Sequence, residues 1–113
     1  MSNAARTERI KALSTLALAI LRRCGERCNI DRAGRSCRLS EVVYNEFRLT
    51  RSRCDDEDQT STLDVRFLGK VVLHVEWTID MVLKTSYRPG EWEALLRRYE
   101  RIPALAGRSS TLM

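Results

Sequence analysis

Residues 63–77 read LDVRFLGKVVLHVEW, and this stretch decides the class of fold. Apolar residues stand at every second position from 63 to 67 and again from 71 to 77, which is the period of a strand with one buried face. Gly69 lies between the two runs and marks a hairpin turn. A two-residue turn at Gly69-Lys70 would place the two apolar sets on opposite faces, whereas a loop with an odd number of residues, bulged at Gly69, places them on the same face. Burial of one common face favours the bulged register.

Helical periodicity flanks this hairpin on both sides. Between residues 5 and 24, apolar side chains recur at three- and four-residue steps, and the same spacing recurs between residues 91 and 102. Pro103 marks the end of the second helix. We expect a third strand at 81–87, where Met81, Leu83 and Tyr87 share one side.

These elements predict an α+β fold, with an N-terminal helix, an antiparallel meander of three or four strands, and a C-terminal helix packed on one face. The length of 113 residues suits one domain, which we place at 1–103, with 104–113 as a flexible C-terminal tail. The predicted core collects the apolar faces of these elements: Ile10, Leu13, Ile20, Leu63, Val65, Phe67, Leu73, Val75, Trp77, Leu83, Trp92, Leu95 and Tyr99.

The segment between the first helix and the hairpin has a weaker pattern. Residues 25–38 are polar and rich in arginine, which predicts a loop. Residues 39–52 fit a strand by propensity, but their apolar positions also fit one face of a helix. We favour the strand. A helix here would instead give the element order helix, loop, helix, hairpin, as in a winged helix-turn-helix with 63–77 as the wing.

Positive charge is concentrated in the second quarter of the chain. The net charge is +5, and segment 22–54 carries nine basic and four acidic residues, whereas segment 55–77 carries two basic and six acidic residues. Seventeen of the twenty basic residues are arginine, whose planar guanidinium suits phosphate and carboxylate. A basic surface of this kind attracts nucleic acid or an acidic protein. The predicted binding surface consists of Arg27, Arg32, Arg35, Arg38, Arg48 and Arg51.

All four cysteines fall in one part of the chain. Cys24, Cys28, Cys37 and Cys54 follow a C-x3-C-x8-C-x16-C pattern, which lacks the C-x2-C pairs usual in zinc sites. Three interpretations stay open: buried thiols, a zinc site, or two disulfides with three possible connectivities. We predict no metal and no cofactor.

His74 is the only histidine. In the bulged register it shares the polar face of the hairpin with Asp64, Arg66 and Glu76. A histidine beside carboxylates and arginine is one candidate for acid–base chemistry on a phosphodiester. The same residues also describe a solvated sheet face with cross-strand ion pairs, so the histidine alone does not predict an enzyme.

Three functions are therefore compatible with the sequence. We favour a small non-enzymatic interaction module, an inhibitor, adaptor or assembly partner, which docks through its arginines on an acidic protein surface or a nucleoprotein complex. The alternatives are a DNA- or RNA-binding regulator of winged-helix-like element order, and a small nuclease-type enzyme centred on His74. The longest apolar run, 16–21, is too short to cross a membrane, so we expect a cytoplasmic protein without a membrane partner.

Overall fold

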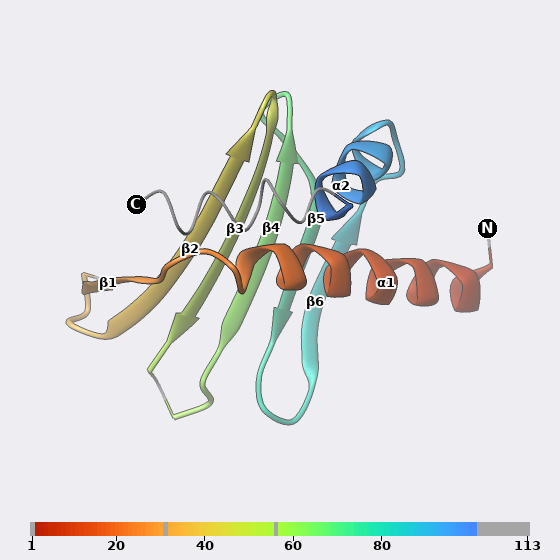
Figure 1. Cartoon of the computed structure of the whole chain (residues 1–113). Coiled ribbons are helices and arrows are strands. Elements are labelled where there is room, and N and C mark those ends of the chain that lie inside the picture. The colour runs from red at the N-terminus through yellow and green to blue at the C-terminus, as the bar shows by residue number, and fades with distance from the viewer. Residues whose placement is uncertain (1, 31, 56, 102–113) are drawn as a thin grey trace.

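Both helices lie on the same face of one antiparallel sheet in the computed structural model, which describes residues 2–30, 32–55 and 57–101 (Figure 1). Within these residues the sheet has six strands, and each strand pairs with the next along the chain. Such a meander needs only short hairpin connections. The elements are α1 (Asn3–Leu21), β1 (Arg27–Ile30), β2 (Ser36–Tyr44), β3 (Phe47–Cys54), β4 (Ser61–Phe67), β5 (Lys70–Trp77), β6 (Val82–Tyr87) and α2 (Trp92–Glu100).

The α+β class and the two flanking helices are confirmed, but the described meander has six strands instead of three or four. The loop predicted at 25–38 is wrong, because β1 and the first part of β2 pair as a hairpin there. Strand pairing satisfies the backbone hydrogen bonds of this segment. Because its side chains are mostly polar, the segment has no hydrophobic periodicity from which the strands could be predicted. The domain boundary predicted at 103 and the tail 104–113 lie outside the described residues.

Residues 39–52 belong to β2 and β3. A tight turn begins at Asn45, whose φ is 54°, and brings Tyr44 opposite Phe47. The favoured strand conformation is confirmed, but as two strands joined by this turn, and the helical alternative is wrong. The described residues therefore do not form the element order of a winged helix-turn-helix.

The hairpin of β4 and β5 buries one common face, as predicted, but the bulge lies within the strands and not at Gly69. The turn holds two residues, Leu68 and Gly69, with φ of 54° and 78°. The register shifts further along, where Val65 pairs with Leu73 and Arg66 pairs with Val71. Because this shift leaves Val72 without its own partner, Leu73 and Val75 share the helix-covered face with the buried residues of β4, whereas Val71 pairs with Arg66 on the open face.

The core fills the space between the helices and the covered face of the sheet. Nine of the predicted core residues are buried, and Phe67, Trp77 and Leu95 are partly buried against them. The prediction that Leu83 belongs to the core is wrong, because its side chain is 51% exposed near the start of the edge strand β6. The core also includes Ala17, Leu21, Val42, Phe47, Leu49, Val72, Tyr87 and Leu96.

Neither α1 nor α2, the helices of the described residues, is long and apolar enough to cross a membrane.

A buried carboxylate connects the two helices to the sheet. The Tyr87 hydroxyl donates a hydrogen bond of 2.6 Å to Glu93, and Arg9 Nε donates one of 2.7 Å to the same carboxylate. Burial alone would raise the pKa of Glu93, but the hydrogen bonds from Tyr87 and Arg9 outweigh it and lower that pKa. Glu93 is thus ionised and paired, although it is only 4% exposed.

Candidate functional site

The candidate site lies on the helix-covered face of the sheet, at the end of β2 and β3 that α1 does not cover. Along β3, Phe47 and Leu49 point into the core, and the next two residues on the same face are Arg51 and Arg53. The side chains on this face of β3 change from apolar to basic where α1 ends, at Leu21. The arginines therefore occupy the part of this face where no helix is left to pack on the sheet.

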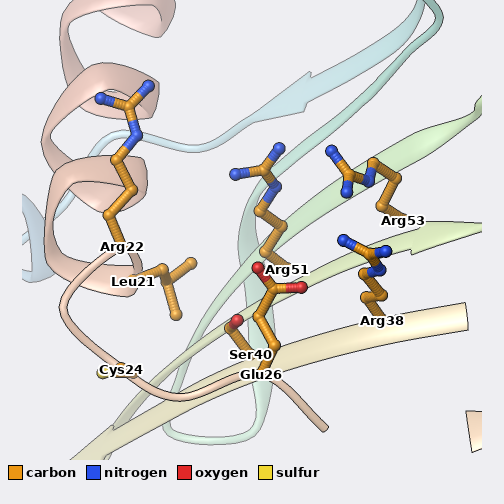
Figure 2. A pocket seen from close by; sticks show the side chains of 8 residues that line it. All are labelled: Leu21, Arg22, Cys24, Glu26, Arg38, Ser40, Arg51 and Arg53. Carbon is orange, nitrogen blue, oxygen red and sulfur yellow. The ribbon is translucent and has the colours of Figure 1, made fainter. Parts of the chain in front are cut away.

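Four arginines surround one pocket at this position (Figure 2). Arg53 is paired with Arg38 across β2 and β3, and Arg51 is paired with Ser40, so these side chains share a face. Arg22, at the end of α1, also lines the pocket, with its guanidinium group beside the helix and apart from the other three. The pocket has a volume of about 120 Å³ and is lined by Leu21, Arg22, Cys24, Glu26, Arg38, Ser40, Arg51 and Arg53.

The pocket contains more positive than negative charge. Its arginines face a single carboxylate, that of Glu26. Burial lowers the pKa of Arg51, and the charges of Arg53 and Arg22 lower it further, whereas Glu26 opposes the change. Within the described residues, no carboxylate forms an ion pair with Arg38 or Arg53. An anion in the pocket would therefore relieve a repulsion that Glu26 compensates only in part.

The arrangement is suited to one compact anionic group. Guanidinium groups donate hydrogen bonds in a planar fork that matches a carboxylate or a phosphate, and such charge-assisted bonds are among the strongest in proteins. The hydroxyl of the buried Ser40 adds a further polar group to the lining. Arg51 also makes a cation–π contact, since its Cζ lies 5.9 Å from the centroid of the Trp77 ring. The pocket can thus recognise a carboxylate or phosphate, and its residues suggest no chemical step.

The structure brings together only part of the predicted binding surface. Arg38 and Arg51 line the pocket. Arg27 and Arg48 point to the opposite face of the sheet, because they pair with Leu39 and Val43, which alternate with the pocket residues. Arg32 and Arg35 lie between β1 and β2, and both are exposed. The six arginines therefore do not form one surface.

Two arginines of the pocket were missing from the predicted surface. Arg53 stands two residues after Arg51, the spacing that puts both side chains on one face of a strand. Arg48 stands three residues before Arg51, and the odd spacing puts it on the other face. Strand alternation could thus have found Arg53. Arg22 has no such signal, because only the packing of α1 on the sheet brings it close.

His74 lies on the open face of the sheet, together with the carboxylates predicted to surround it. Its Nδ1 contacts Asp64 across the strands, and its Nε2 lies 2.8 Å from Glu76. Burial would lower the pKa of His74, but the two carboxylates outweigh it and raise that pKa. Both ring nitrogens are thereby occupied. The residues match the cross-strand ion pairs considered from the sequence, and nothing in this geometry favours the nuclease.

The cysteines do not converge on one point. Cys28 pairs with Arg38 on the helix side of the sheet, whereas Cys37 and Cys54 pair with each other on the open face. Accordingly, no group of three or more His, Cys, Asp or Glu side chains within residues 2–30, 32–55 and 57–101 is placed to hold a metal ion. All four cysteines are described, and none is disulfide-bonded.

Comparisons with known proteins do not assign the chain to a family. No protein-family model, no curated protein and no solved structure matches the chain. The eight residues that line the cavity of Figure 2 are called the arginine pocket below.

Proposed function

We propose that this protein is a non-enzymatic interaction module, and that it docks on a partner protein by holding one anionic group of the partner in the arginine pocket. The observation that carries the proposal is that four arginines and one carboxylate line the same cavity. Uncompensated charge of this kind is unfavourable in the isolated protein and favourable once an anion is bound.

The shape of the site favours a single group over a long polyanion. Nucleic-acid backbones are bound along an extended basic path that neutralises several phosphates. Here the four arginines line one pocket at one end of the sheet, and the connection that follows Cys54 carries Asp55, Glu57 and Asp58. These carboxylates would repel a backbone that continued past the pocket. An acidic or phosphorylated side chain of a protein fits the site better.

The proposal is tested with labelled peptides and fluorescence anisotropy. One peptide carries a single phosphoserine among neutral residues, a second carries glutamate at that position, and a third carries serine. We expect the protein to bind the first two and not the third, because only they carry the anion. Affinity should fall as salt is raised, since the contact is electrostatic.

A matched pair of double variants separates the pocket from the net charge. Arg38→Gln/Arg53→Gln removes two charges from the pocket, and Arg27→Gln/Arg48→Gln removes two charges from the opposite face. The pocket variant should lose about a hundredfold in affinity, because it loses two charge-assisted bonds and each costs about 1.5 kcal/mol. The control should stay within about twofold of the wild type, because its charges are distant and screened.

Two results would contradict the proposal. Equal losses in both double variants would show that binding follows net charge alone. Tighter binding of a duplex DNA than of either anionic peptide at the same salt concentration would favour the nucleic-acid alternative.

A further inference from the structure

Cys37 on β2 and Cys54 on β3 stand directly opposite each other. Both side chains are half-buried on the open face of the sheet, which the helices do not cover. Neighbouring pairs along the same strands alternate between the two faces, so Arg38 and Arg53, the next pair, belong to the arginine pocket on the other side.

Backbone hydrogen bonds identify the type of this cysteine pair. The N–H of Cys54 donates to Thr60 on the β4 side, at 3.0 Å, and therefore not to β2. The N–H of the next residue, Asp55, donates to Ser36 of β2 at 2.9 Å. Hydrogen-bonded and non-hydrogen-bonded pairs alternate in an antiparallel ladder, so Cys37 and Cys54 form a non-hydrogen-bonded pair.

A pair of this type is close enough for a covalent bond. The two Cα atoms of a non-hydrogen-bonded pair are separated by about 4.5 Å, and their side chains approach more closely than in the alternate pairs. A disulfide needs a Cα separation of roughly 4.4–6.8 Å. The strands therefore already hold Cys37 and Cys54 at a distance that a disulfide can bridge with little backbone movement.

We propose that Cys37 and Cys54 are a redox site, which forms a reversible intramolecular disulfide across β2 and β3. The oxidant is a small-molecule disulfide such as oxidised glutathione. The thiolate of one cysteine attacks it, forming a mixed disulfide and releasing one glutathione thiolate. The second cysteine, after losing its proton, attacks the protein sulfur of the mixed disulfide and expels the second glutathione. Two protein thiols are oxidised and one small disulfide is reduced to two thiols.

The other two cysteines are poorly placed to compete. Cys28 points to the helix side of the sheet, away from the pair. The thiol of Cys24 lies 3.7 Å from the carbonyl of Ile20, and burial raises the pKa of Cys24, which disfavours the thiolate that exchange requires. Among the possible pairs of cysteines, the fold thus favours a single bond between Cys37 and Cys54.

The test incubates the folded protein with oxidised glutathione, then blocks remaining thiols and measures its mass. We expect a monomer that carries two blocking groups, where the reduced protein carries one on each of its four cysteines, and a linked peptide containing Cys37 and Cys54 after digestion. Because the bond closes a short loop, the melting temperature should rise by roughly 5–15 °C, and a dithiol reductant should reverse the rise.

Two double variants make the experiment decisive. Cys24→Ser/Cys28→Ser should form the bond as the wild type does, and Cys37→Ser/Cys54→Ser should show neither the mass change nor the rise in melting temperature. Glutathione adducts without a linked peptide, covalent dimers, or a link that involves Cys24 or Cys28 would overturn the proposal. The readouts do not depend on any ligand of the arginine pocket.

Discussion

Two charged clusters lie at opposite ends of α1, and they differ in how the charge of their arginines is compensated. Near the start of the helix, Arg9 bonds to the buried Glu93, which also accepts a hydrogen bond from Tyr87. Beyond the end of the helix, the arginine pocket sets four guanidinium groups against Glu26. In the first cluster the charges of Arg9 and Glu93 are paired with each other, and the cluster connects α1, β6 and α2. The second is left open to an anion from outside.

This comparison separates two roles of the same side chain. A charge that is paired within the fold contributes to holding elements together, and its loss should lower stability. A charge that is left unpaired among like charges contributes little to stability and is available for binding. Measurements of stability can therefore distinguish the two clusters independently of any ligand.

The largest effect should come from Glu93→Ala. The substitution leaves the buried hydroxyl of Tyr87 without its acceptor and removes the partner of Arg9, so we expect the free energy of unfolding to fall by about 2 kcal/mol. Urea denaturation measures it. Glu8→Ala is the control, because Glu8 forms only an exposed pair with Lys11 and its loss should change stability by less than about 0.5 kcal/mol. Equal effects of the two substitutions would remove the distinction between the clusters.

The pH dependence sharpens the assignment of Glu93. Because its pKa is lowered in the fold, its contribution is complete above the unfolded pKa of a glutamate, about 4.3, and is lost as the pH falls through the folded pKa. The difference in stability between the wild type and Glu93→Gln should therefore shrink at acid pH. A constant difference would show that the charge of Glu93 is not what stabilises the cluster.

His74 offers an intermediate case, a charge paired on the open face of the sheet. Because its pKa is raised, its contribution is complete below the unfolded pKa of about 6.5 and is lost as the pH rises through the folded pKa. We expect the wild type to lose about 0.5–1 kcal/mol relative to His74→Gln between about pH 6 and about pH 9. Thermal unfolding across this range measures the loss, and parallel pH profiles would contradict it.

The smallest effect should come from the pocket itself. Arg53→Gln removes one of the mutually repelling charges, so at low salt we expect stability to stay the same or to rise by about 0.5 kcal/mol. Added salt should abolish the gain. Arg27→Gln, on the opposite face, corrects for the change in net charge. A loss of stability of about 1 kcal/mol or more in Arg53→Gln would place this arginine in the structural class with Arg9.

Some of the candidate site could be predicted from the sequence. The abundance of arginine between 22 and 54 indicated the basic region, and it contains all four arginines of the pocket. The predicted set failed where Arg48 was grouped with Arg51, since a strand sends residues at odd spacing to opposite faces. The prediction of a loop at 25–38 hid the same alternation in β2 and therefore separated Arg38 from its partner Arg53.

The sequence by itself determined the α+β class, the two helices and most of the core, because apolar periodicity reports which face of each element avoids water. Only the tertiary structure decided which charges meet. Arg22 and Arg53 are 31 positions apart in the sequence and line one pocket, and Cys37 and Cys54 face each other across two strands. Such neighbours depend on strand register and on where a helix ends over the sheet, and both are settled by packing of the whole chain and not by local sequence.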